Sequence, residues 1–105
     1  MIQFVKKLFG MGPQTNYKDL VKNGAVIVDV RSRSEFSSGH VRNALNIPLN
    51  ELTGGMKDLP TNKVIITCCA SGIRSSAAKS MLTASGYKEV YNGGGWMSLN
   101  GKLEN

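Results

Sequence analysis

The chain has 105 residues, of which 41% are hydrophobic and 19% charged, values typical of one soluble globular domain. Thirteen Lys and Arg against seven Asp and Glu give a formal net charge of +6, which attracts anions of any kind. The basic residues are scattered and form no run interleaved with aromatic residues, so we expect no nucleic-acid partner.

Residues 1–12 are predicted to be an N-terminal amphipathic extension, with a single domain over residues 13–105. Apolar residues recur at helical spacing from Ile2 to Phe9, and Gly10–Pro13 ends the pattern. We favour a helix docked on the domain or a frayed terminus. The alternative is contact of residues 1–9 with a membrane surface or a partner protein. The sequence shows no signal peptide or membrane span, which predicts a cytoplasmic protein with reduced cysteines.

Helices and strands alternate along the rest of the chain, which predicts an α/β fold with a mostly parallel sheet. Predicted strands cover residues 25–30, 44–48, 63–68 and 89–91. Predicted helices cover residues 17–23, 34–39, 49–52 and 74–85. We expect a loop over residues 53–61, and a sharp turn over residues 92–96 that leads into a final short helix. The 25–30 and 63–68 segments are nearly all apolar, as in strands that are covered on both faces.

The clearest chemical signal is the segment from Cys69 to Arg74, which links a buried strand to a helix. If this loop curls, its backbone N–H groups form an anion-binding nest over the Cys69 sulfur. The helix N-terminus adds partial positive charge at the same place. Both effects lower the pKa of a thiol and favour the nucleophilic thiolate. Cys69 is therefore the candidate nucleophile, and the candidate substrate-binding residues are Ala70, Ser71, Gly72, Ile73 and Arg74.

Cys68 is interpreted as a buried thiol of the strand, with a resolving thiol beside the nucleophile as the alternative. A disulfide between neighbouring cysteines would be strained. The two cysteines and one histidine lack the paired spacing of metal ligands, so no metal is expected.

Four further polar residues precede the loop, and structural roles are favoured for them over acid–base chemistry. Asp29 ends a predicted strand, where its carboxylate can accept N–H bonds from neighbouring loops. Arg31 and Glu35 lie four residues apart and are expected to form a local ion pair. His40 is expected to make a structural hydrogen bond.

Four segments between about Tyr17 and Leu99 resemble the motifs of single-domain rhodaneses, in the order that this family shows. They are Val28–Arg31 with Glu35-Phe36 and Gly39–Val41, then Ala44–Leu49, then Cys69–Ser75, and finally Gly86-Tyr87 with Gly94–Trp96. The resemblance implies a central, mostly parallel five-stranded sheet flanked by helices. It places the loop that carries Cys69 at the carboxyl edge of the sheet, where open α/β sheets bind ligands.

The implied activity is that of a sulfurtransferase, which needs no cofactor. Cys69 would take a sulfane sulfur from a small anionic donor such as thiosulfate, or from a persulfide-carrying protein. The resulting persulfide would pass the sulfur to a thiol or cyanide acceptor. Asp29, Arg31 and His40 would support the site. The loop has six residues from Cys69 through Arg74, as in sulfur-transferring members, whereas the related phosphatases and arsenate reductases have one more.

The loop departs from the family pattern at two positions. Many members carry basic residues where this chain has Ala70 and Ile73, so capture of a small dianion such as thiosulfate is expected to be weak. Two other functions remain open from the sequence. One is a non-catalytic rhodanese-like binding module, and the other is a thiol oxidoreductase that uses Cys68 and Cys69.

Overall fold

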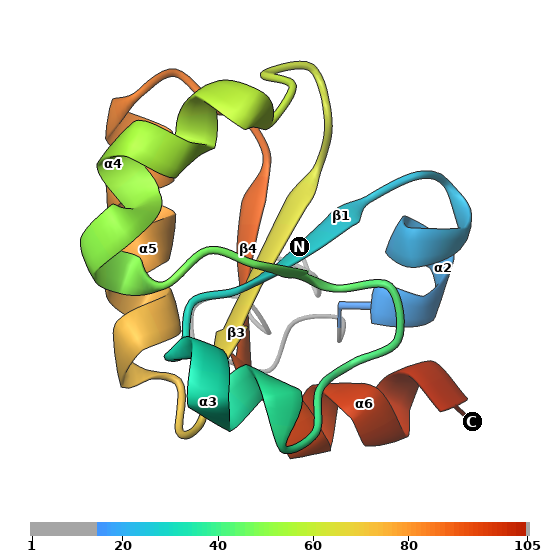
Figure 1. The fold of residues 1–105 in the computed structure, drawn as a ribbon. Helices are drawn as coiled ribbons and strands as arrows, with labels where there is room; N and C mark the ends of the chain where they lie inside the picture. Colours follow the sequence, from blue (N-terminus) through green and yellow to red (C-terminus); the bar gives the residue numbers. More distant parts are fainter. Residues whose placement is uncertain (1–14, 105) are drawn as a thin grey trace, which may run out of the picture.

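The computed structural model describes residues 15–104 (Figure 1); the predicted extension at residues 1–12 lies outside them. The strands are β1 (Val26–Asp29), β2 (Leu45–Asn46), β3 (Ile65–Cys69) and β4 (Val90–Gly95). The α-helices are α2 (Tyr17–Lys22), α3 (Arg33–Ser37), α4 (Leu52–Gly55), α5 (Ile73–Ala84) and α6 (Trp96–Glu104). Two 3₁₀ helices, η1 (Leu49–Glu51) and η2 (Met56–Asp58), flank α4.

The strands form one parallel sheet in the order β2-β1-β3-β4, which confirms the predicted α/β class. Within residues 15–104 the sheet has four strands, so the expectation of five was wrong. Each of the four predicted strand segments supplies one strand. The described chain between them is taken up by helices and turns and contains no further apolar run of strand length.

Helices cover both faces of the sheet, and each face has its own core (Figure 1). Leu52 of α4 and Leu82 of α5 pack on one face with Val28 and Ile65. Leu99 of α6 packs on the other face, together with partly buried residues of α2. Because side chains alternate along a strand, β3 contributes to both cores.

Two segments differ from their predicted structure. Thr53–Asp58, expected as a loop, is helical; the apolar side chains of Met56 and Leu59 pack on the α5 core and hold it in place. β4 continues to Gly95 where a turn was expected. A Cβ on Gly93 would lie 2.9 Å from the Thr67 carbonyl oxygen, so these glycines allow β4 to approach β3 closely rather than forming a turn.

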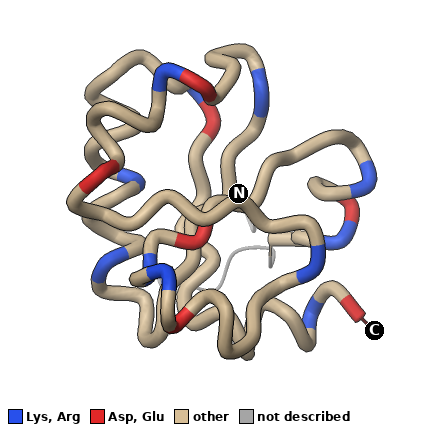
Figure 2. Tube along the Cα trace, in the orientation of Figure 1, with Lys and Arg blue, Asp and Glu red and all other residues tan. Residues whose placement is uncertain are grey.

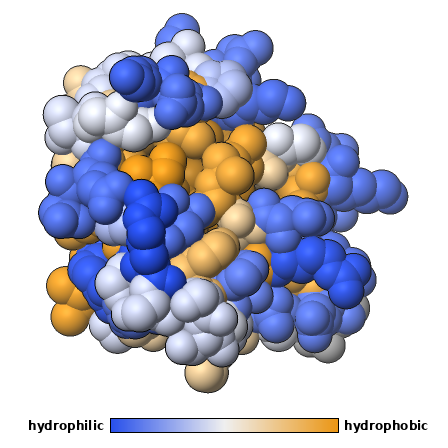
Figure 3. All heavy atoms as spheres, in the orientation of Figure 1, coloured by the Kyte–Doolittle hydropathy of each residue, from blue (hydrophilic) through white to orange (hydrophobic). Residues whose placement is uncertain are grey.

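The surface is mixed in character. Lys and Arg are spread around the described trace and alternate with Asp and Glu (Figure 2). An apolar area lies in the middle of the face seen in Figure 3. None of the helices in residues 15–104 combines the length and the hydropathy needed to span a bilayer.

Candidate active site

Cys68 and Cys69 end β3 and are both fully buried, but they belong to different cores. Cys69 packs with Ala78 of α5, whereas Cys68 packs with Leu99 of α6. This follows from the alternation of side chains along a strand. The two thiols therefore point to opposite faces of the sheet, and only Cys69 lies on the face that α5 covers.

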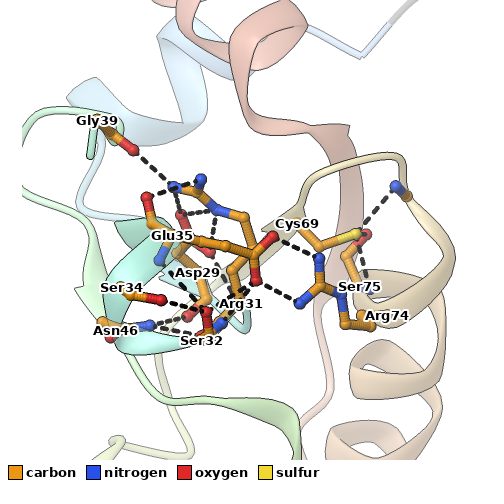
Figure 4. Close-up of polar contacts among 11 residues, drawn as sticks. Asp29, Arg31, Ser32, Ser34, Glu35, Gly39, Asn46, Cys69, Arg74 and Ser75 are labelled. Carbon is orange, nitrogen blue, oxygen red and sulfur yellow. Dashed lines mark hydrogen bonds and ion pairs between the residues drawn. The ribbon is translucent and has the colours of Figure 1, made fainter. Parts of the chain in front are cut away.

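Backbone N–H groups converge on the Cys69 sulfur (Figure 4). The N–H of Gly72 donates to Sγ over 2.9 Å and the N–H of Ser75 over 3.3 Å. Gly72 has a φ of +102°, in the left-handed region that glycine adopts without strain. This conformation turns the chain back over the sulfur. The sulfur thus lies within the first turn of α5, where the helix N-terminus adds partial positive charge.

The surroundings shift the two thiols in opposite directions. Burial alone would raise the pKa of Cys69, but hydrogen bonds from Ser75, Gly72 and Ser71 to the ionised sulfur outweigh it, and the pKa is lowered. The pKa of Cys68 is raised to about 12, mainly by burial and further by the negative charge of Asp29. At neutral pH, Cys68 therefore remains a thiol, whereas the surroundings of Cys69 favour its thiolate more than those of an ordinary cysteine.

Arg74, at the end of the loop, is engaged by a carboxylate. Its guanidinium donates two hydrogen bonds to Glu35, over 2.7 and 2.9 Å. Glu35 also completes the N-terminal cap of α3, with a hydrogen bond from the Ser32 N–H. Arg74, followed by the cap at Ser32, holds the pKa of Glu35 at about 2. The pair joins the start of α5 to the start of α3.

The predicted ion pair between Arg31 and Glu35 was wrong. Arg31 donates from Nε and Nη2 to the Asp29 carboxylate, over 2.7 to 3.0 Å, and reaches only the backbone carbonyl of Glu35. Arg31 also donates to the Gly39 carbonyl over 2.7 Å, and its guanidinium lies 4.8 Å from the Trp96 ring centre. The Glu35 carboxylate is thus left to pair with Arg74 instead.

Asp29 and His40 make the structural contacts expected of them. Asp29 is fully buried and accepts the Arg31 backbone N–H over 3.0 Å. His40 is exposed, its Nδ1 lies 2.7 Å from the Phe36 carbonyl oxygen, and its ring stacks on the Phe36 ring. Asp29 and Arg31 therefore form a rigid frame at the end of β1, and His40 is engaged at the end of α3.

Sequence reasoning missed two residues at the sulfur. Ser75 is buried on the inner face of α5, whereas the apolar Ala77 of the same helix is exposed. Ser75 Oγ lies 3.4 Å from Cys69 Sγ and donates to Asn92 Oδ1 over 2.6 Å. The position of Ser75 in the first turn after the loop could have signalled its role. The glycines after Asn92 indicated a turn, so nothing in the sequence placed Asn92 near Ser75.

The surface around the sulfur is formed by the outer part of the loop. Ala70 and Ser71 are exposed, and Ile73 is 78% exposed. Beside Arg74 lies a surface hollow of about 480 Å³, bounded also by residues after β1 and by η1. Among residues 15–104, no group of three or more His, Cys, Asp or Glu is placed to hold a metal ion. What the arrangement can do chemically is stabilise a thiolate or another anion at Cys69.

Most of this chain is similar in sequence to known proteins. YqhL of Bacillus subtilis is 36% identical over 81 residues, which cover 76% of this chain and 64% of YqhL. The thiosulfate sulfurtransferase GlpE of Ectopseudomonas mendocina is 30% identical over 87 residues, covering 83% of this chain and 74% of GlpE. A solved Escherichia coli structure, described as a rhodanese with anions, matches with a TM-score of 0.65 and 31% identity, over 71% of this chain and 91% of that chain.

The sequence model of the Rhodanese-like domain matches residues 13–101. This match includes all four strands of the sheet, the loop from Cys69 to Arg74 and Asn92. The parallel sheet with helices on both faces agrees with the fold of the solved rhodanese. The chain therefore belongs to the family of rhodanese-like domains.

Proposed function

We propose that this domain is a sulfurtransferase and that Cys69 is its nucleophile. The observation that carries the proposal is the convergence of the Gly72 and Ser75 N–H groups on Cys69 Sγ. These donors lower the pKa of the thiol, and the thiolate is the form that attacks sulfur. They also stabilise a negative charge that moves from Sγ to a newly bound sulfur atom.

The reaction would proceed in two displacements. In the first, the Cys69 thiolate attacks the sulfane sulfur of the donor, and the bond from that sulfur to the rest of the donor breaks. With thiosulfate, sulfite leaves with the electron pair and Cys69 becomes a persulfide anion. In the second, a thiolate or cyanide attacks the terminal sulfur and the Cys69 thiolate leaves. Each step exchanges one anion for another, so the reaction requires no added oxidant or reductant.

A persulfide on a thiol or a protein suits the site better than thiosulfate as donor. Arg74 is the only charged side chain of the loop, and Glu35 already compensates its charge. Ala70 and Ile73 add no charge, and the exposed side chain of Ile73 offers an apolar contact. Because Cys69 has no exposed surface, the proposal also requires residues 70–72 to move outward when the donor arrives.

The orientation of Cys68 argues against a thiol oxidoreductase built from the two cysteines. Cys68 lies in the α6 core, and its pKa of about 12 keeps it protonated. Attack by Cys68 on a persulfide at Cys69 would require it to leave that core and cross to the other face of the sheet.

The test is to incubate the protein with a sulfane donor and measure its mass. Wild type and Cys68→Ser should each gain one sulfur atom, and cyanide should remove it as thiocyanate. Cys69→Ser should gain none. Loading of Cys69→Ser to the same extent would refute the assignment of the nucleophile. Absence of loading in folded wild type with thiosulfate and with a thiol persulfide would favour a binding module instead.

A further inference from the structure

Asn92 is linked to the Cys69 sulfur through a single hydroxyl group. Cys69 Sγ donates to Ser75 Oγ over 3.4 Å, and Ser75 Oγ donates to Asn92 Oδ1 over 2.6 Å. Asn92 Oδ1 also accepts the Gly94 N–H over 2.9 Å. A backbone N–H can only donate, so this contact identifies the amide atom that faces Ser75 as oxygen, an acceptor.

The Ser75 hydroxyl has one proton, and two groups can receive it. When the proton points to Asn92, the Ser75 oxygen presents a lone pair to Cys69, which suits a neutral S–H donor. A thiolate has no proton to donate, so the Ser75 hydroxyl stabilises it only by turning its own proton toward the sulfur. That turn breaks the 2.6 Å hydrogen bond to Asn92. The amide of Asn92 and the ionised sulfur therefore compete for the same proton.

We propose that Asn92 is a positioning residue which holds the Ser75 hydroxyl away from Cys69 and so offsets part of the stabilisation that the backbone N–H groups give to the thiolate. The inference rests on the proposed function only in taking Cys69 as the nucleophile. Its value lies in tuning, because the nucleophilicity of a thiolate falls as its basicity falls, and the best attacking thiol ionises near the ambient pH. Without this restraint, the donors around the sulfur would lower the pKa of Cys69 further.

The other groups around the sulfur do not reproduce this effect. The nearby charges are Arg74 on α5, which pairs with Glu35 of α3, and the Asp29–Arg31 pair after β1. Cys68 stays neutral, and residues 92–99 of β4 and α6 carry no charged side chain. Asn92 acts through hydrogen bonding alone. Its short contact is the one with the Ser75 hydroxyl, over 2.6 Å; its Nδ2 also donates to the Gly72 carbonyl over 3.4 Å, a longer contact to the residue whose N–H meets the sulfur.

The experiment is a double-mutant cycle on Asn92→Ala and Ser75→Ala. The ionisation of Cys69 is followed by the ultraviolet absorbance of the thiolate and by alkylation rate against pH, with Cys69→Ser as the blank. Asn92→Ala should shift the midpoint to lower pH by about one unit, since a hydrogen bond to a charged group becomes free to form. In the Ser75→Ala background, Asn92→Ala should shift the midpoint much less, because only the long contact from Asn92 to the Gly72 carbonyl then remains to be lost.

Three results would overturn the proposal: no shift for Asn92→Ala, a shift to higher pH, or an equal shift with and without Ser75. If Asn92→Ala does not fold, Asn92→Asp keeps the side-chain shape and the bond from the Gly94 N–H. The carboxylate of Asn92→Asp should hold the Ser75 proton more strongly than the amide does. It should therefore raise the midpoint of Cys69 ionisation more when Ser75 is present than in the Ser75→Ala background. Equal shifts would show a direct charge effect and refute the role of Ser75.

Failure of this proposal is distinguishable from failure of the proposed function. Persulfide loading is measured separately, at a pH well above each midpoint, where Cys69 is ionised in every variant. A normal titration cycle without loading would reject sulfur transfer and leave the role of Asn92 intact. Normal loading without coupling between Asn92 and Ser75 would do the reverse.

Discussion

Cys68 and Cys69 are neighbours in the chain, yet their surroundings shift their thiol pKa values in opposite directions. Both are fully buried, and burial raises the pKa of each. The difference comes from donors: Cys69 faces the first turn of α5 and receives N–H bonds, whereas Cys68 faces apolar side chains of the other core. A shift of one residue along β3 would exchange their environments.

At the same scale, we expect Ala70→Arg to improve the use of thiosulfate. Ala70 is exposed beside the sulfur, and the loop has no uncompensated cation. An added guanidinium should lower the KM for thiosulfate about two- to fivefold at low salt, the range of an exposed charge interaction. Added salt should reduce the gain by screening. Steady-state kinetics with cyanide as acceptor measures both effects.

Ala70→Gln is the matched control, because it adds a polar side chain of similar length without charge. It should leave the KM for thiosulfate close to that of wild type. Saturation of wild type by micromolar thiosulfate, or no effect of the arginine at low salt, would show that the loop already binds dianions well.

At the scale of elements, the Glu35–Arg74 pair joins the start of α3 to the start of α5. Both side chains are about one third exposed, so solvent screens the interaction. The bidentate geometry nevertheless fixes the relative orientation of the two helix starts. Since Arg74 directly precedes Ser75, the same contact helps to hold the Ser75 N–H over the sulfur.

We predict that Glu35 makes the stability of the domain depend on pH in the acid range. Its pKa is about 2 in the folded protein, below the ordinary value of 4.5. A carboxylate with a lowered pKa stabilises the fold above its ordinary value, and this contribution is lost as the pH falls from about 4.5 to about 2. The difference in unfolding free energy between wild type and Glu35→Gln should therefore shrink over that interval.

Urea unfolding at several pH values measures this difference. The matched control is Glu51→Gln, which removes a more exposed pair with Arg33. Its effect on stability at neutral pH should be smaller than that of Glu35→Gln. A difference between wild type and Glu35→Gln that stays constant from neutral pH to about 2 would contradict the assigned role of Glu35.

Local sequence patterns predicted most of the helices and strands. The errors in the prediction come from contacts between residues that are distant in the sequence. The apolar runs of β1 and β3 are local signals, and the structure confirms the strands they indicate. Arg74, the partner of Glu35, is 39 residues away in the sequence. The four-residue spacing between Arg31 and Glu35 therefore predicted the wrong ion pair. The extension of β4 depends on the close approach of Gly93 to Thr67. Only the assembled sheet specifies such a contact.

At the scale of the whole molecule, the candidate site occupies the edge of the sheet where the strands end, the place that the resemblance to rhodaneses implied. β1 ends at the Asp29–Arg31 frame, β3 ends at Cys69, and β4 brings Asn92 beside Ser75. Each contribution comes from a separate strand, and the parallel arrangement gathers them at one edge. All of these residues lie within residues 13–101, the part of the chain that matches the family.

We therefore predict that residues 1–12 are dispensable for sulfur transfer. The family match begins at residue 13, and every contact described for Cys69 comes from residues of β3, the loop and α5. A chain that begins at residue 13 should unfold cooperatively and turn over within a few-fold of the full chain. Serine at the apolar positions Phe4, Val5, Leu8 and Phe9 of the full chain should change stability or association with a partner or membrane surface, and leave turnover at the same level. Thermal unfolding, vesicle binding and cyanolysis measure these three properties. A shortened chain that folds but no longer transfers sulfur would show that the extension helps to build the site, and the domain would then have to begin before residue 13.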